Sequence, residues 1–147
     1  MVSININAAS KQKFDKRMQE ISAEIDDYVR AECEDSLLWI EEQATLAVPV
    51  DFGFLKNSIQ TEPIKKTEKG LTGSVEVGSQ YAAYVEFGTG TTVDVPAGLE
   101  EFAIQFKGAG IKQVNLQARP FFYPAVFKQQ KLLPEAIKKT IEILLKR

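Results

Sequence analysis

Two acidic side chains near the middle of the chain are the first candidates for chemistry. Glu86 lies in the run YAAYVEF, and Glu76 lies in the run LTGSVEVG. Both runs predict strands, so the two carboxylates would share one face of a sheet, and glycoside hydrolysis needs two carboxylates at a defined separation. The same arrangement suits solvated surface charge, or ion pairs with Lys65, Lys66 or Arg119, and surface charge is the commoner case. Hydrolysis is therefore kept as a minor alternative.

The other familiar kinds of active site find little support. The chain has no histidine, which excludes a Ser-His-Asp or Cys-His arrangement and leaves zinc without a credible ligand set. Gly88-Thr89-Gly90 lacks the third glycine of a dinucleotide fingerprint and the Gly-Lys-Ser/Thr ending of a phosphate loop, so we interpret it as a glycine-rich exit from a strand. Cys33 lies on an apolar helical stripe, where burial keeps a thiol inert. We expect no catalytic residue, no cofactor and no metal.

The composition is that of one globular domain. The chain has 147 residues, of which 44% are apolar and 26% are charged, enough for one core but not comfortably for two. A single cysteine forms no intramolecular disulfide, no apolar run approaches the roughly 20 residues of a membrane span, and the polar start lacks the core of a signal peptide. The net charge of -2 gives no general attraction to nucleic acid. We expect synthesis in the cytoplasm, one domain over residues 1–147, and no membrane partner.

A long helix is the first element predicted to position these residues. Residues 10–47 contain no proline or glycine, and apolar residues recur at steps of three and four. An unbroken helix of this length would span roughly 55 Å, whereas a compact domain of this size is roughly 40 Å across. The helix therefore either breaks, near Asp26-Asp27 or Asp35-Ser36, or carries its end beyond its own domain and against another subunit. The apolar positions are Phe14, Met18, Ile21, Ile25, Tyr28, Val29, Cys33, Leu37, Ile40 and Ala44.

A short junction follows the helix. Pro49 must end the helix, because proline disfavours helical geometry in the residue before it and lacks a backbone donor. Asp51 is placed to cap a short turn, and Gly53 is free to adopt a positive φ. Leu55 and Ile59 lie one helical turn apart.

Three strands are predicted after the junction. Residues 71–77 alternate in polarity, and residues 59–66 are a weaker candidate in which Pro63 indicates a sheet edge. The turn at Glu68-Lys69-Gly70 makes these two an antiparallel hairpin. Residues 81–87 are predicted as a third strand, with Glu86 on its polar face.

A long loop and a last helix complete the chain. Residues 88–118 are punctuated by glycine and proline, with room for one short helix at 99–106, and loops of this length are usually functional or disordered. From Pro124 onward, apolar residues at helical steps predict a helix with the basic end Lys146-Arg147. Pro134 either starts this helix in its first turn or kinks it.

Three segments occur in a fixed order along the chain: AVPVDFGFLKNSI, VGSQYAAYVEFGTG and ARPFFYPAV. Together they resemble the small head-tail joining proteins of tailed bacteriophages and prophages, also called tail-completion or neck proteins, whose prototype is gene product ten of a lambda-like coliphage. In that family the segments usually read Ala-Pro-x-Asp-Thr-Gly-x-Leu-x-x-Ser-Ile, Tyr-x-x-x-x-Glu-x-Gly-Thr and Ala-x-Pro-Phe-x-x-Pro-Ala. Here Phe52 replaces the usual threonine, residues 91–117 have their own sequence, and Pro134 interrupts the last helix.

The resemblance implies a fold and a function. The implied fold is α+β, with a long N-terminal helix, a small antiparallel sheet of three to four strands and a C-terminal helix packed on the sheet. The implied function is that of a non-enzymatic virion protein of the phage neck, forming a ring that joins the capsid connector to the tail, with the genome passing through. Its neighbours would be further copies of the chain, head-closure or connector proteins, and tail terminator or tail tube proteins, with DNA only as non-specific cargo.

The resemblance also implies roles for the matched residues. Glu86 would be a structural or interface carboxylate, and Gly88-Thr89 would mark the point where a strand meets a loop that contacts another subunit. The residues expected to be structural or to lie at an interface are Pro49, Asp51, Gly53, Leu55, Ser58, Tyr81, Glu86, Gly88, Thr89, Arg119, Pro120, Phe121 and Pro124.

A nucleic-acid-binding or regulatory module is the alternative function. It would use Arg119 and the basic last helix, which carries Lys138, Lys139, Lys146 and Arg147. These cations fall off the apolar stripe of the helix and no aromatic residues interleave with them, so a solvated helix face explains them as well. Salt-dependent binding of DNA by the purified protein would favour this alternative.

Overall fold

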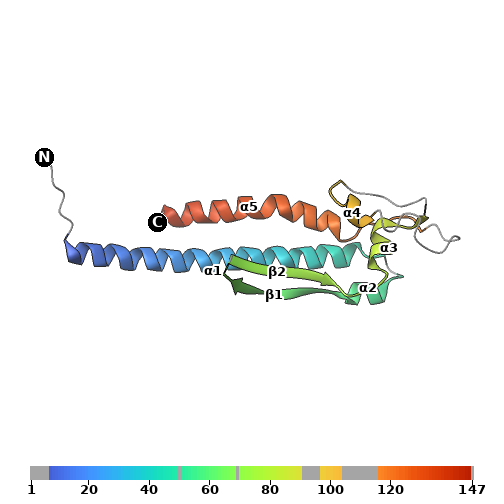
Figure 1. The fold of residues 1–147 in the computed structure, drawn as a ribbon, viewed down its shortest axis with the longest axis horizontal. Helices are drawn as coiled ribbons and strands as arrows, with labels where there is room; N and C mark the ends of the chain where they lie inside the picture. The colour runs from blue at the N-terminus through green and yellow to red at the C-terminus, as the bar shows by residue number, and fades with distance from the viewer. Residues whose placement is uncertain (1–6, 50, 69, 91–96, 104–115, 147) are drawn as a thin grey trace.

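The computed structural model describes residues 7–49, 51–68, 70–90, 97–103 and 116–146. A long helix, a hairpin and a second long helix dominate them. The two helices run side by side in opposite directions, and the hairpin lies along another side of the first helix (Figure 1). The predicted α+β class is confirmed. The elements in chain order are α1 (Ala8–Ala47), α2 (Gly53–Asn57), β1 (Ile59–Thr67), β2 (Gly70–Val77), α3 (Ala82–Phe87), α4 (Glu100–Ala103) and α5 (Tyr123–Leu145).

Helix α1 is continuous over 40 residues, or about 60 Å at 1.5 Å per residue. The Asn7 side chain caps its start by accepting the N–H of Ala9 at 2.9 Å, and the helix ends just before Pro49, as predicted. The proposed breaks near Asp26-Asp27 and Asp35-Ser36 are wrong. Aspartate and serine lower helix propensity by only a fraction of a kcal/mol, which is too little to interrupt a helix without proline or glycine.

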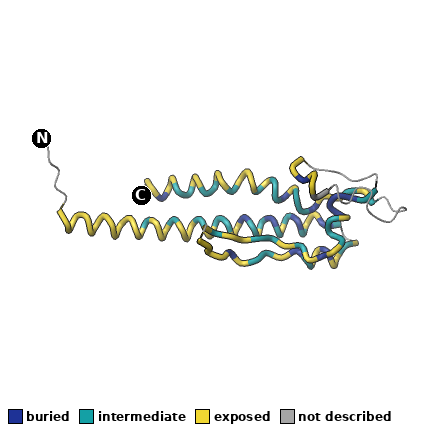
Figure 2. The backbone as a smooth tube through the Cα atoms, viewed as in Figure 1, coloured by how far each residue is buried: buried dark blue, intermediate teal, exposed yellow. Residues whose placement is uncertain are grey.

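The first turns of α1 extend past the rest of the molecule (Figure 2). Every described residue up to Glu20 is exposed, and Ile21 is the first that is partly covered. We call residues 8–20 the overhang. It is about 20 Å long at the helical rise.

Among the described residues the sheet has two strands, not the predicted three to four. β1 and β2 pair antiparallel from Ile59 opposite Val77 to Thr67 opposite Gly70, and the register shifts between Glu62 and Lys65. Pro63 occupies that shift, because proline cannot donate a ladder hydrogen bond.

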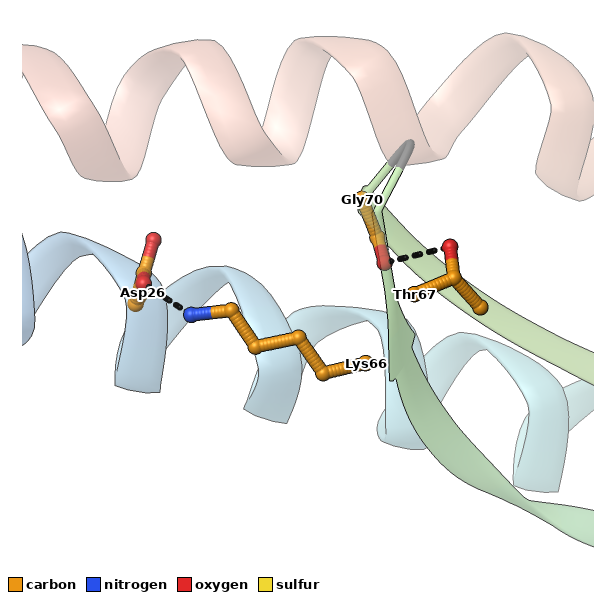
Figure 3. A network of polar contacts seen from close by, with 4 residues as sticks. All are labelled: Asp26, Lys66, Thr67 and Gly70. Carbon is orange, nitrogen blue, oxygen red and sulfur yellow. Dashed lines mark hydrogen bonds and ion pairs between the residues drawn. The ribbon is translucent and has the colours of Figure 1, made fainter.

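The tip of the hairpin is tied to α1 (Figure 3). Lys66 Nζ lies 2.9 Å from Asp26 Oδ2, and Thr67 Oγ1 donates to the carbonyl of Gly70 at 3.0 Å. Both partners of the ion pair are more than half exposed, so it contributes at most about 1 kcal/mol.

The predicted third strand is a helix. Residues 82–87 form α3, in which Val85, Glu86 and Phe87 are buried in succession, a pattern that no strand with one solvated face produces. Gly88 ends the helix at a φ of 77° and donates its N–H to the carbonyl of Tyr84. A segment of six residues is too short for its apolar period to separate helix from strand.

The core lies at the end of the molecule away from the overhang. One buried cluster joins the end of α1, α2, β1, α3 and the residue two positions before α5, and a second lies beside it around Phe87 and Leu99. The first cluster consists of Ala44, Val48, Leu55, Ile59, Val85 and Phe121.

Helix α5 packs chiefly against α1 rather than on the sheet. Lys128 Nζ lies 4.7 Å from the centre of the Trp39 ring, and Thr140 Oγ1 donates to Glu32 Oε1 at 3.1 Å. The helix begins at Tyr123, so Pro134 lies inside it and does not start it. Of the predicted loop, residues 91–96 and 104–115 lie outside the described residues, and α4 accounts for the described part of the helix expected at 99–106.

Candidate functional site

The Glu86 carboxylate is the centre of the most connected polar cluster among the described residues. Only 3% of the residue is exposed. Its Oε2 atom accepts the backbone N–H groups of Phe121 at 2.8 Å and Phe122 at 3.0 Å, and Oε1 accepts that of Tyr123 at 3.1 Å. We call this arrangement the Glu86 clasp.

The clasp caps the start of α5 with a side chain that is distant in sequence. Phe122 is the N-cap of α5 and its own side chain makes no capping hydrogen bond. The first N–H groups of a helix lack partners within the helix and carry partial positive charge, so a carboxylate placed there both satisfies and stabilises them. Glu86 on α3 therefore fixes where α5 begins.

Backbone hydrogen bonds extend the clasp on one side. Arg119 donates its N–H to the carbonyl of Val85 at 2.8 Å, and Thr89 donates its N–H to the carbonyl of Leu116 at 2.9 Å. Leu116 in turn donates its N–H to Thr89 Oγ1 at 2.9 Å. The segment from Val85 to Thr89 is thus bound along its length to residues 116–123.

Aromatic rings surround the clasp. The Tyr123 ring lies 5.6 Å from that of Phe87, 5.7 Å from that of Phe122 and 6.0 Å from that of Phe127, measured between ring centres. Burial, and then the negative charge of Glu86, raise the pKa of Tyr123 above its usual value of 10.0. The phenol is therefore neutral at physiological pH.

The expected pairing of Glu86 with Glu76 is wrong. Glu76 lies exposed on β2 opposite Gln60, whereas Glu86 is buried on α3, so the two share no sheet face. The interpretation of Glu86 as surface charge is wrong for the same reason. Its three donors lie 35 to 37 residues further along the chain, and only the resemblance marked it as structural.

The first resembling segment forms a compact corner. Leu55 is fully buried, Ser58 Oγ donates to its carbonyl at 2.8 Å, and the carbonyl of Pro49 accepts the N–H of Phe52 at 3.0 Å. Two expectations fail here, since the N-cap of α2 is Phe52 with no side-chain cap and the φ of Gly53 is not positive. Asp51 and Gly53 are both exposed.

The other resembling segments converge on the same corner. The Tyr81 ring lies 5.9 Å from the Phe52 ring, and Phe121 is buried in the cluster with Leu55 and Val85. Arg119, Pro120 and Pro124 are exposed, and Pro124 lies in the first turn of α5. The structure therefore brings the three segments together into one corner of the chain. The exposed residues of this corner are Asp51, Gly53, Arg119, Pro120 and Pro124.

Several large apolar side chains that the sequence did not single out are exposed. The most exposed are Leu46 on α1, at 68%, and Phe54 on α2, at 72%. Leu38 and Leu46 lie off the main apolar stripe of α1 at helical steps from each other, and this spacing was the signal available in the sequence.

The remaining candidates are Cys33 and the basic residues of the last helix. Burial first, and then the charges of Glu32 and Glu34, raise the pKa of Cys33, which keeps the thiol protonated as expected. Lys138, Lys139 and Lys146 are exposed, and Arg147 lies outside the described residues. Within the described ranges, no group of three His, Cys, Asp or Glu residues could hold a metal ion. No helix in that part of the chain is long and apolar enough to cross a membrane.

The fold and the clasp define a small α+β protein whose buried polar cluster joins segments of its own backbone. A family model described as "Bacteriophage HK97-gp10, putative tail-component" matches residues 12–88, just over half of the chain. The chain belongs to this family of bacteriophage tail components. The match includes most of α1, the hairpin and Glu86, and stops before the third resembling segment. No curated protein and no solved structure matches the chain.

Proposed function

We propose that copies of this chain form a ring at the phage neck that joins the capsid connector to the tail and completes the tail top, with the genome passing through. The overhang is the observation that carries the proposal. It exposes Phe14 to 64% and Met18 to 48% on a helix that extends past its own core. In a member of a phage tail family, a neighbouring subunit is the natural cover for this surface.

A structural role fits the chemistry of the clasp. Both oxygens of Glu86 are already engaged by backbone N–H groups and the residue is almost fully buried. A general acid or base must reach its substrate within hydrogen-bond distance. Glu86 therefore supports a non-enzymatic virion component whose rigid corner holds its helices in place.

The convergence of the three segments supports treating residues 1–147 as a single head-tail joining domain. The first core cluster takes residues from α1 through to Phe121, so α2, the hairpin and α3 share one interior. The exposed members of the motifs, Asp51, Gly53, Arg119, Pro120 and Pro124, then remain for contacts with other neck proteins, such as the connector above and the tail terminator or tube below.

Labelled particles test the proposal. The chain would be tagged at its C-terminus in the phage that encodes it, and the tag located on purified particles by electron microscopy with gold-labelled antibody. We expect label at the junction of head and tail, and headless tails or tailless heads when the gene is deleted. Label along the tail or on the capsid shell, or particles that lack the chain, would contradict the neck assignment.

A further inference from the structure

The overhang has a basic face with an apolar centre. Residues 8–20 contain four basic and two acidic side chains. Lys11 and Arg17 each lie three positions from Phe14, and Met18 lies four positions after it, so all four share one side of the helix. Phe14 and Met18 are among the exposed large hydrophobic residues.

The remainder of α1 has an acidic face with apolar residues of its own. Residues 21–47 contain eight acidic side chains and one basic side chain. Exposed residues at helical steps make up one continuous surface, which we call the outer face of α1. It consists of Glu24, Tyr28, Asp35, Leu38, Glu42 and Leu46.

Few of these charges are paired among the described residues. Ion pairs among the described residues join Arg17 to Glu20 at 3.4 Å and Lys66 to Asp26 at 2.9 Å. Neither pair involves a carboxylate of the outer face, and Arg17 of the basic face pairs only with an exposed neighbour one turn away. Both surfaces are therefore available to a second molecule.

The two surfaces cannot meet in one copy, because both belong to the same unbroken helix. We propose that the overhang of one copy docks on the outer face of α1 in a second copy. The overhang is about 20 Å long and the outer face, from Glu24 to Leu46, is about 33 Å long, so the one fits along the other. Phe14 and Met18 are about 6 Å apart along the helix and would lie between Tyr28 and Leu38, which are about 15 Å apart, while the surrounding charges attract.

This contact deepens the proposed function and rests on it, since it supplies the interface through which copies assemble. The two docking surfaces differ, so when one overhang is docked the pair still has a free overhang on one copy and a free outer face on the other, and repeating the contact closes a ring when the rotation allows. Opposite charge at the rim also speeds association and rejects misaligned neighbours.

Charge reversal tests the docking in solution. One variant carries Lys11→Glu and Arg17→Glu, a second carries Glu24→Lys, Asp35→Lys and Glu42→Lys, and sedimentation velocity at low salt reports association. We expect each variant alone to associate at least about tenfold more weakly than the natural chain, and a mixture of the two to regain association. A matched control, Lys138→Glu with Lys139→Glu on α5, should associate normally.

Zero-length cross-linking provides a second readout that detects weak association. Carbodiimide would be added to a mixture of copies with and without a heavy nitrogen label, so that mass spectrometry separates links between copies from links within one. We expect links between copies that join Lys11, Lys13 or Lys16 to Glu24, Asp35 or Glu42. No such link, or a mixture of charge variants that stays dissociated, would overturn the docking.

The outcomes separate this proposal from the neck assignment and from nucleic-acid binding. Label at the neck without these cross-links would support the proposed function and contradict the docking. Cross-links in a protein that is absent from particles, or that forms only closed dimers, would support the docking and contradict the proposed ring at the neck. If reversal of Lys11 and Arg17 abolished binding to a DNA duplex but left association unchanged, the overhang would be a DNA contact, and the docking would be wrong.

Discussion

Glu86 Oε2 accepts the backbone N–H of Phe121 at 2.8 Å, across 35 positions of sequence. This hydrogen bond joins the end of α3 to the start of α5, next to the cluster that contains Leu55 and Val85. Removal of the carboxylate should therefore disturb the whole corner and not only one helix end.

The first prediction concerns this carboxylate. Glu86→Ala leaves one buried and two part-buried N–H groups without an acceptor and opens a cavity, so we expect a loss of about 3 kcal/mol of unfolding free energy. Urea denaturation followed by circular dichroism measures it. Glu76→Ala on the exposed face of β2 is the matched control and should change stability by less than about 0.5 kcal/mol. Equal effects of the two substitutions would contradict the clasp.

Gly88 should resist substitution. Its φ of 77° and ψ of -170° lie in a region that is essentially restricted to glycine, so Gly88→Ala should cost about 1–3 kcal/mol. Gly53 offers the control, because its φ is not positive and an added Cβ meets no atom within 4 Å. Gly53→Ala should be neutral or slightly stabilising, and the same denaturation measurement compares the two.

The stability of the chain should fall at alkaline pH through Tyr123. Its pKa is raised in the folded state, so its contribution is complete below the unfolded pKa of about 10 and is lost as pH rises through the folded pKa. Tyr123→Phe should flatten the decline measured by denaturation above that pH, whereas Tyr28→Phe on the exposed side of α1 should not. An unchanged alkaline slope in Tyr123→Phe would show that the phenol is not responsible.

The thiol of Cys33 should react slowly. Burial and two neighbouring glutamates raise its pKa, which lowers the thiolate fraction at neutral pH. We expect a colorimetric disulfide reagent to modify the folded protein at least about tenfold more slowly than the unfolded protein. Equal rates in the two states would indicate that the thiol is exposed and unperturbed.

The overhang should matter for assembly and not for folding. Phe14→Ser with Met18→Ser removes apolar groups that are exposed in a single copy, so unfolding free energy should change by less than about 0.5 kcal/mol. Association in sedimentation velocity should nevertheless weaken. A large loss of stability would mean that these side chains are buried within the single copy.

The sequence predicted the elements that have long or sharply bounded patterns. Helix α1 follows from an uninterrupted apolar period that ends at Pro49, and the hairpin follows from alternation around the turn at Gly70. Helix α3 was missed because six residues carry too little periodicity. Successive residues of α3 are buried because residues distant in sequence, such as Phe121, pack around them. A local sequence pattern carries no information about such contacts.

The candidate site was predictable only in part. The resemblance marked Glu86, Gly88, Thr89 and Phe121, and the structure places these four residues in or beside the clasp. The partners of Glu86 are backbone groups, and backbone groups have no sequence signature. The capping role of Asp51 failed because the chain turns one residue later, at Phe52.

Glu86 accepts hydrogen bonds only from backbone N–H groups of residues 121–123. These hydrogen bonds therefore do not depend on which side chains those positions carry. Substitutions there that keep the backbone path can therefore alter the aromatic surroundings while the joint itself stays intact. Such a joint lets the outward-facing positions of this corner adapt to a different neighbour without the subunit losing its shape.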